Sequence, residues 1–283
     1  MPVSPSSSAQ AAREAVAGRL KELRADAGIT GPELASRCGW SHPTTYRIEG
    51  ARTPPSADDI RRWCDACNAG GQADDIIAQS RSAESMYMDW RRQVRTGLKQ
   101  LQNSYVPLFK STQLFRIYSP TLVPGQLQTE GYAAGLLSSI MRFRDVPDDV
   151  AEAVAARLDR SRIIHEPGHR FVMVIEEPVL YYQLGDQEAM AAQLGYLLTA
   201  GALPSVSLGI IPRARRSRPM WPQEVFHVYD ESLVSVELLA ARVQVTQPSE
   251  IALYLKAFEQ LRAMAVYGAE ARTLIVRAID ALH

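Results

Sequence analysis

The sequence predicts an α+β protein, with a small all-α domain followed by a larger domain that has a mostly antiparallel sheet. Three observations support this. Residues 11–67 consist of short segments with helical apolar periodicity and capping residues. Strand-like apolar segments then recur between residues 114 and 239, most of them as closely spaced as strands in hairpins. Helical patterns at residues 248–266 and 269–282 close the chain. Grouped in this way, the elements favour an α+β fold.

Composition limits the class of protein. The chain has 283 residues, enough for two domains, and 46% are hydrophobic, enough for a substantial core. Lys plus Arg and Asp plus Glu number 31 each, which argues against a generally basic surface but not against a local basic face. The N-terminus lacks the apolar segment of a secretory signal, and no stretch approaches the roughly 18 apolar residues of a membrane span. With only three cysteines, we expect a cytoplasmic, non-membrane protein.

We expect four segments along the chain. Residues 1–10 are rich in Pro and Ser and predict a disordered tail. A helical domain covers residues 11–75, and a linker covers residues 76–85. The α+β domain covers residues 86–283. It begins with an amphipathic helix over residues 86–105, and its expected strands include "VLYYQL" at residues 179–184.

The helical domain has the capping residues and the glycine turn of a helix-turn-helix. The first helix ends at Gly28, a typical C-cap. Thr30 and Glu33 form a capping box for a short second helix, which ends at the glycine turn "GWS". Ser41 then caps a third helix, "HPTTYRIE". The alternative is an ordinary helical hairpin, but the glycine turn and the inward apolar residues occur at the spacing that places the third helix in a DNA major groove about 12 Å wide.

Two other motifs suggest metal or redox chemistry. "HEPGH", His165–His169, matches the H-E-x-x-H pattern of zinc peptidases, which needs a continuous helix to place both imidazoles on one face. Because an interior proline costs a helix about 3 kcal/mol, we expect a turn at Pro167–Gly168 and no metal site. "CDAC", Cys64–Cys67, matches a redox or zinc half-site pattern. It lies inside a helix with no second pair nearby, so we expect structural thiols, no cofactor and no catalytic residues.

The string "LKELRADAGITGPELASRCGWSHPTTYRIEGARTPPS" resembles the Xre-type, lambda-repressor-like helix-turn-helix family, most specifically in "IEG" followed by "RTPPS". The resemblance implies that residues opening the third helix, and the one before the Ile-Glu pair, read base edges. These are His42, Pro43 and Arg47, with Ser41 and Thr44 as nearby base or phosphate contacts. Thr45 falls at a position that faces the core.

Two departures from the family pattern affect DNA recognition. Many relatives have a glutamine where this chain has Gly31, which can offer a phosphate only its backbone N–H at a helix N-terminus. Pro43 replaces a common polar reader and cannot donate a hydrogen bond. Arg47 is therefore the best single base reader, since its guanidinium can bind guanine O6 and N7. Arg52, just after the helix, is expected to contact phosphate.

The rest of the chain carries a second resemblance. "RIYSPTLVPGQLQTEGYA", residues 116–133, resembles the C-terminal domain that follows Xre modules in actinobacterial antitoxin-like regulators. That family has no chemistry to carry over, but its members are commonly paired with a small protein encoded by a neighbouring gene. The rigid segment "SPTLVPG" within the signature favours a corner of the fold over a binding surface.

Basic residues are unevenly distributed. Residues 11–67 have nine basic and eight acidic side chains, whereas residues 81–116 have seven basic and two acidic. The loop "RARRSR" adds four arginines, which are Arg213, Arg215, Arg216 and Arg218. A solvated loop, a phosphate contact or a binding site for an acidic partner would each explain them. A nearly neutral DNA-binding domain must gather its few cations on one face.

Together these observations predict a cytoplasmic, nucleoid-associated and non-enzymatic regulator of transcription. We expect a homodimer that binds a double-stranded operator with an inverted repeat. The larger domain would dimerise and respond to a small partner protein. The alternative is a regulator gated by a small-molecule ligand held between sheet and helices. An apolar pocket lined by buried polar groups favours the ligand, and a broad exposed apolar or basic patch favours the protein.

Overall fold

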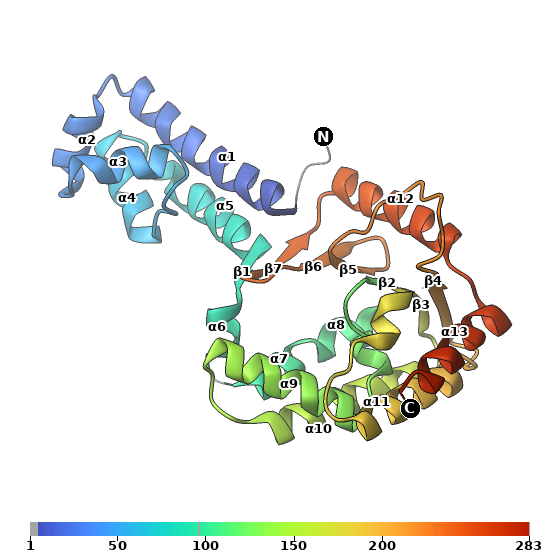
Figure 1. Cartoon of the computed structure of the whole chain (residues 1–283). Coiled ribbons are helices and arrows are strands. Elements are labelled where there is room, and N and C mark those ends of the chain that lie inside the picture. Colours follow the sequence, from blue (N-terminus) through green and yellow to red (C-terminus); the bar gives the residue numbers. More distant parts are fainter. Residues whose placement is uncertain (1–4, 96, 283) are drawn as a thin grey trace. The chain divides into compact units, whose positions relative to one another are not determined.

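The computed structural model describes residues 5–95 and 97–282, without the side chains of residues 5–9, 11, 81–89, 91 and 92. The chain divides into two compact units, Met1–Met88 and Asp89–His283. Five α-helices and one 3₁₀ turn form the first unit up to residue 86 (Figure 1): α1 (Pro5–Asp26), α2 (Gly31–Cys38), α3 (His42–Glu49), α4 (Ala57–Ala66), η1 (Gly70–Gln72) and α5 (Ala73–Met86).

The first unit has its own apolar core, which holds the helix-turn-helix together. Leu20, Leu34, Ile48 and Trp63 are among its fully buried side chains. The Trp63 indole also donates a hydrogen bond to the Leu20 carbonyl oxygen at 2.9 Å, so the largest buried ring keeps its polar atom satisfied. Thr30 caps α2, and Ser56 and Asp59 form a complete capping box at α4.

Both ends of the first unit differ from the expected layout. The helix α1 begins at Pro5, so residues 5–10 of the expected tail are helical, and residues 1–4 of it lie outside the described part of the chain. Proline suits the first turn of a helix because its missing N–H would be unpaired there anyway. The expected linker at residues 76–85 lies within α5, because Ile76 and Ile77 are buried in the core of this unit.

The larger unit is built on a mixed sheet. Its strands are β1 (Tyr87–Asp89), β2 (Leu114–Ser119), β3 (Arg170–Glu176), β4 (Val206–Ile211), β5 (Val225–Tyr229), β6 (Leu233–Glu237) and β7 (Ala241–Val245), in the order β1-β7-β6-β5-β2-β3-β4. The pairs β2–β5, β5–β6 and β6–β7 are antiparallel, and β2–β3 and β3–β4 are parallel. The predicted α+β fold with a mostly antiparallel sheet is confirmed.

Helices and short 3₁₀ turns connect these strands: α6 (Trp90–Val94), α7 (Leu98–Ser104), α8 (Val106–Ser111), η2 (Gly125–Leu127), α9 (Glu130–Arg144), α10 (Val150–Ser161), η3 (Arg162–His165), η4 (Glu177–Tyr181), α11 (Gln187–Ala200), α12 (Pro248–Met264) and α13 (Gly268–Asp280). None of the described helices combines the length and apolar character needed to cross a lipid bilayer.

Three local expectations for this unit are wrong. In place of the single helix expected over residues 86–105, the chain forms β1, α6 and α7. Gly97 precedes α7, has φ of +105° and lets the Asp149 carboxylate accept the N–H groups that open this helix. The expected strand "VLYYQL" is absent from this part of the chain, because β3 ends at Glu176 and the turn η4 follows, with Pro178 as its second residue. The strand β7 was not predicted.

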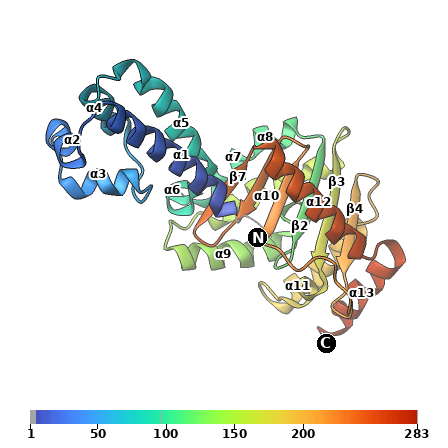
Figure 2. The same ribbon diagram turned by 90° about the horizontal axis from the view of Figure 1, so that it is seen from above.

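Helices cover both faces of the sheet (Figures 1 and 2). One face packs against α12, where the rings of Phe226 and Phe258 lie 6.4 Å apart. Helices α7, α9, α10 and α11 lie over the other face. Because side chains alternate along a strand, Val225, His227 and Tyr229 of β5 point toward this second layer of helices and line a cavity there.

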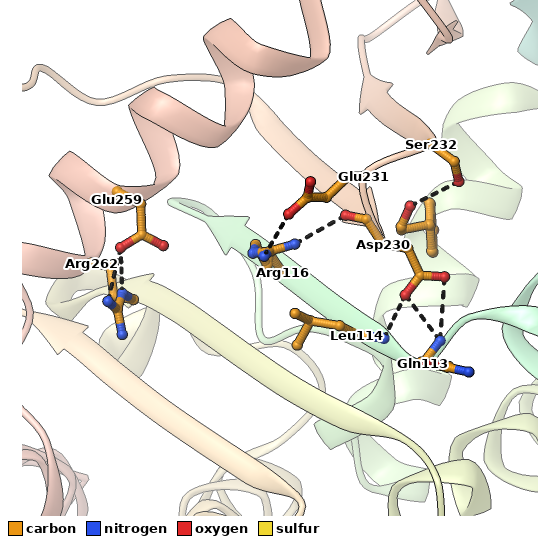
Figure 3. A network of polar contacts seen from close by, with 9 residues as sticks. Gln113, Leu114, Arg116, Asp230, Glu231, Ser232, Glu259 and Arg262 are labelled. Atoms are coloured by element: carbon orange, nitrogen blue, oxygen red, sulfur yellow. Dashed lines mark hydrogen bonds and ion pairs between the residues drawn. The ribbon is translucent and has the colours of Figure 1, made fainter. Parts of the chain in front are cut away.

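The β5–β6 turn is tied to the start of β2 (Figure 3). Asp230, with φ of +51°, accepts hydrogen bonds on its carboxylate from the backbone N–H groups of Gln113 and Leu114. Arg116 donates to the Asp230 carbonyl oxygen at 3.0 Å and pairs with Glu231 at 3.5 Å. Arg116, the first residue of "RIYSPTLVPGQLQTEGYA", therefore has a structural role.

Candidate nucleic-acid interface

The helix α3 presents one buried and one exposed face. Thr45 and Ile48 point inward and are at most 2% exposed. The Trp40 indole donates to Thr45 Oγ1 at 3.0 Å, so this buried hydroxyl has a partner. The expectation that Thr45 belongs to the core is confirmed.

The opposite face of α3 carries the residues expected to read DNA. Ser41, His42, Pro43 and Arg47 are exposed, and Thr44 is partly exposed. The Ser41 and Thr44 hydroxyls are hydrogen bonded at 3.0 Å, and Arg47 Nη2 donates to Thr44 Oγ1 at 3.3 Å. The structure thus brings these five side chains onto one surface of the first unit.

Tyr46 is an additional member of this surface that the sequence analysis missed. Its side chain is 56% exposed, and its ring makes an edge contact with the His42 imidazole at 4.8 Å between centroids. The signal was present in the sequence, because His42 and Tyr46 are four residues apart and therefore neighbours on one helix face.

An ion pair with α1 fixes the position of α3. Arg24 Nε and Nη2 donate to the two carboxylate oxygens of Glu49 at 2.5 and 3.2 Å, and Arg24 Nη1 donates to the Ile29 carbonyl oxygen at 2.9 Å. The pair is largely shielded, with side-chain exposures of 18% and 8%. Hydrogen bonding to Glu49 raises the pKa of Arg24. Glu49 of "IEG" therefore ties the end of α3 to α1.

Arg52 lies close to the C-terminal end of α3. The chain turns at Ala51, which has φ of +53°, and the N–H groups of Arg52 and Thr53 both donate to the Arg47 carbonyl oxygen, at 2.9 and 3.2 Å. Arg52 is exposed. The turn thus holds a second guanidinium next to the helix that carries Arg47.

Gly31 does not lie on the exposed surface. It is buried, and a Cβ on it would lie 3.7 Å from the Tyr46 ring. The Thr30 hydroxyl oxygen accepts the N–H of Glu33 at the same helix terminus. The expected phosphate contact through the Gly31 N–H is therefore not favoured in this structure.

Cations of the first unit differ in their pairing, and Lys21 and Arg61 share with the α3 surface the lack of an ion pair among the described residues. Four arginines of this unit form ion pairs with carboxylates: Arg19, Arg24, Arg37 and Arg62. Among the described residues, Arg47 and Arg52 form none. In a unit with almost balanced charge, these two guanidiniums are available for a phosphate or a base edge.

The "CDAC" cysteines are structural. Cys64 lies in α4 and Cys67 directly follows it, and both are buried together with Cys38 as free thiols. Burial raises the pKa of Cys38 and of Cys67 to about 11. Since the thiolate is the reactive form, these side chains act as small apolar core residues at neutral pH.

The "HEPGH" segment forms the predicted turn. Residues Arg162–His165 are a 3₁₀ turn, Gly168 has φ of +89°, and β3 begins at Arg170. The His169 imidazole is hydrogen bonded through Nδ1 to the Thr112 carbonyl oxygen at 2.6 Å. The two histidines share no helix face. Within the part of the chain that the structure describes, no three His, Cys, Asp or Glu side chains are grouped to hold a metal ion.

The "RARRSR" loop is partly anchored. Arg218 makes a two-point contact with the buried Glu176 carboxylate, at 3.0 and 2.6 Å, and the Tyr118 hydroxyl donates to the same carboxylate at 2.9 Å. The backbone N–H of Arg213 donates to Glu177. Arg218 thus holds the loop to the end of β3, which corrects its expected role in partner binding. Exposed side chains remain at Arg213, Arg215 and Arg216.

The second unit also contains a cavity of about 200 Å³ between the sheet and the helices α7, α9 and α10. The segment Leu122–Gly125 of the expected rigid corner lines it, together with the following Gln126. This segment is held by the Ser119 hydroxyl, which donates to the Leu122 carbonyl oxygen at 2.7 Å. The "SPTLVPG" segment therefore forms a corner and a cavity wall at once.

Comparison with known proteins identifies both parts of the chain. A family model described as "Helix-turn-helix domain" matches residues 15–75, which confirms the predicted motif. A second model, described as "Domain of unknown function (DUF5753)", matches residues 106–277. No curated protein matches the chain.

One solved structure shows a weak likeness. It is reported as "Structure of TrmBL2, an archaeal chromatin protein, shows a novel mode of DNA binding", and the alignment covers 85% of this chain and 88% of that one. The identity is 11% and the TM-score is 0.31. A likeness at this level establishes neither a shared fold nor a shared function.

Proposed function

This chain belongs to the family described as "Domain of unknown function (DUF5753)" and carries a helix-turn-helix domain ahead of it, and we propose that it is a sequence-specific DNA-binding regulator of transcription. The observation that carries the proposal is the exposed face of α3. It gathers the hydroxyls of Ser41 and Thr44 with two guanidiniums that have no ion-pair partner among the described residues.

In this proposal α3 enters the major groove. Arg47 binds a guanine through O6 and N7, the contact for which a guanidinium is best shaped. His42 and Pro43 lie at the N-terminal end of the helix, which faces the base edges in helix-turn-helix proteins. Pro43 can contact a thymine methyl group, whereas Ser41, Thr44 and Arg52 contact phosphates. Gly31 keeps only a secondary role, because it is buried.

The proposed assembly is an Xre-type homodimer on an inverted repeat. One α3 offers few cations, so a single helix-turn-helix unit binds only modestly. Joining two units through the larger domain raises the effective concentration of the second and gives both affinity and half-site spacing. A cytoplasmic, nucleoid-associated protein without enzymatic activity fits this role.

The larger unit is the proposed control point. In the antitoxin-like form of the proposal, a small partner protein binds it, and the exposed Arg213, Arg215 and Arg216 offer a dock for acidic groups. The alternative is control by a small molecule. The cavity of about 200 Å³ between sheet and helices is the specific observation that favours this alternative.

Selection from random duplex DNA with the full chain tests the proposal. We expect enrichment of an inverted repeat whose half-site centres lie about 34 Å apart. If the selection recovers random sequences and the chain binds all duplexes with equal affinity, the proposal of sequence-specific binding is wrong.

Two fragments test the assembly. A break at residue 75 would cut α5, which ends at Met86, and a break after residue 88 would cut β1, so the fragments are residues 1–86 and 87–283. We expect residues 87–283 to sediment as a dimer. Residues 1–86 should be monomeric and bind the selected operator at least about tenfold more weakly than the full chain. A monomeric 87–283 fragment would contradict the dimeric arrangement.

A further inference from the structure

The cavity in the second unit has an apolar body and one polar wall. Its apolar lining comes from α7, α9, the segment before η2 and the strand β5, and includes Leu98, Leu101, Leu136, Leu137 and Val225. Its volume of about 200 Å³ exceeds the roughly 150 Å³ of an engineered cavity that holds benzene. The space therefore suits a molecule with one small ring or a short chain.

Two arginines of α10 form the polar wall. Arg157 Nε and Nη1 donate to the side-chain oxygens of Gln102 and Gln128, at 3.1 and 2.6 Å. Arg160 Nη1 donates to the Gln102 carbonyl oxygen at 2.9 Å, and its guanidinium lies 4.9 Å from the centres of the Tyr105 and Phe109 rings. The two cations are thus held in fixed directions by neutral groups.

These positive charges lack a carboxylate partner. Within the described part of the chain, neither Arg157 nor Arg160 forms an ion pair. Glu237 is the only described carboxylate that lines the cavity; it lies at the exposed end of β6, and its charge partly offsets both guanidiniums without forming an ion pair. Loss of hydration, followed by the neighbouring charge of Arg160, lowers the pKa of Arg157 to about 10. Two partly desolvated cations beside an apolar space attract an anion.

Two polar atoms on this wall have no hydrogen-bond partner among the described residues. One is the donor Nε of Arg160, and the other is the acceptor Oε1 of Gln126, a residue only 3% exposed. Both residues line the cavity, and Arg160 Nη2 lies 4.0 Å from the position of a Cβ on Gly125, the residue before Gln126. Buried polar atoms normally have partners. Both atoms are closed to a water-sized probe, so a ligand that satisfies them needs an acceptor, a donor and a small shift of the two side chains.

We propose that the cavity is a binding site for a small hydroxycarboxylate with an apolar body. The carboxylate accepts hydrogen bonds from Arg160, the ring or chain fills the apolar space, and the hydroxyl donates to Gln126 Oε1. Arg157 adds favourable charge. A phosphate ester fits less well, because most of the lining is apolar and the site offers few further donors.

The site adds detail to the alternative in which a small molecule controls the protein. Ligand binding itself does not depend on the proposed function, and only its effect on DNA binding rests on that function. Trp90 lines the cavity, and its indole donates to the Leu238 carbonyl oxygen at 2.8 Å. Trp90 is also the fourth residue after the end of α5 at Met86. A ligand in the cavity therefore contacts the chain segment that leads to the DNA-binding unit. Ligand binding is measured without DNA, so failure of either idea is seen separately.

The test is calorimetric titration of the full chain with chosen probes. We expect at least one of the three hydroxybenzoates to bind with a Kd below about 1 mM. Benzoate should bind about threefold to tenfold more weakly, because Gln126 stays unpaired. The neutral hydroxybenzamides and inorganic phosphate should bind at least about tenfold more weakly than the best hydroxybenzoate. Absence of hydroxybenzoate binding, or equal binding of the amides, would overturn the proposal.

Variants locate the binding on this wall. Arg160→Gln should weaken hydroxybenzoate binding at least about tenfold, whereas the matched control Arg162→Gln should not, because Arg162 is 78% exposed and pairs with Asp159. Gln126→Leu should make hydroxybenzoate and benzoate bind alike. If Arg160→Gln does not fold, Val225→Phe fills the cavity from β5 and should abolish binding. Unchanged affinity in a folded Arg160→Gln or Val225→Phe protein would place the ligand elsewhere.

Discussion

Arg24 and Glu49 form a two-point ion pair that joins the end of α1 to the end of α3. Both side chains are mostly shielded from solvent, and a further N–H, on Arg24 Nη1, donates to the Ile29 carbonyl oxygen. A pair of this geometry fixes both the distance and the rotation of the helices, because two parallel hydrogen bonds define a plane. The orientation of the proposed DNA-reading helix therefore depends on an ion pair within the protein.

Breaking this pair should loosen α3. In Glu49→Gln, Arg24 keeps its charge in a mostly shielded place without a carboxylate, and we expect a loss of about 1–3 kcal/mol. Amide hydrogen exchange of the full chain, measured on residues 42–49, reports the loss locally. The control is Glu33→Gln, which removes the exposed pair with Arg37 and should cost less than about 1 kcal/mol. Equal exchange in the two variants would show that the pair does not hold the helix.

Arg47 and Arg52 should affect DNA binding in different ways. Arg47→Ala removes the proposed guanine contact, so operator binding should weaken by about 1–3 kcal/mol and one base position per half-site should relax. Arg52→Ala removes a phosphate contact, so all sequences should weaken alike and the salt slope should fall by about 1.

The measurement for both variants is titration of the selected operator and of single-base variants at several salt concentrations. Arg62→Ala is the control, because Arg62 is on α4 and pairs with Asp58. If Arg47→Ala retains full base discrimination, or if Arg52→Ala alters it at one position only, the proposed docking of α3 is wrong.

The buried thiols should make the first unit sensitive to alkali. Burial raises the pKa of Cys38 and Cys67 from 9.0 to about 11, so the folded state keeps these protons longer than the unfolded state. The contribution to stability is complete below pH 9 and is lost as the pH rises from 9 to about 11. Hydrogen exchange on α2 and α4 across this pH range measures the effect.

A thiol-specific reagent gives an independent reading of the same property. At neutral pH the three cysteines should react only when the first unit opens, because the buried thiols remain protonated. In the variant Cys38→Ala/Cys67→Ala, most of the loss of stability between pH 9 and about 11 should disappear. The intrinsic pH dependence of amide exchange remains in this variant as in the unchanged protein. Fast labelling of the native chain at neutral pH would contradict this account.

Gly97→Ala should destabilise the second unit. Gly97 has φ of +105°, and an added Cβ would lie 2.4 Å from Asp149 Oδ2, the carboxylate that caps α7. Backbone strain of this kind costs about 1–3 kcal/mol, and displacement of the cap adds to it. Thermal unfolding of the full chain measures the shift. Gly195→Ala is the control, because nothing lies within 4 Å of its Cβ position in α11, and it should stabilise by about 1 kcal/mol.

Much of the first unit follows from the sequence itself. The capping residue Thr30, the turn at Gly39 and the inward spacing of Leu34 and Ile48 predict helices that the structure contains at those places. The turn at Pro167–Gly168 also follows from the sequence alone. Each of these depends on interactions within a few residues of the chain, so local periodicity and capping are sufficient to predict them.

Only the tertiary structure decides the remaining features. Gly97 breaks a helix because Asp149 reaches it from 52 positions along the chain, and the loop residue Arg218 is anchored by Glu176 at the end of β3. Arg157 and Arg160 have the sequence pattern of solvated helix positions, yet Gln102, Tyr105 and Phe109 enclose them beside a cavity. Partners this distant in sequence determine burial and charge environment through packing, and neither helical periodicity nor residue type contains that information.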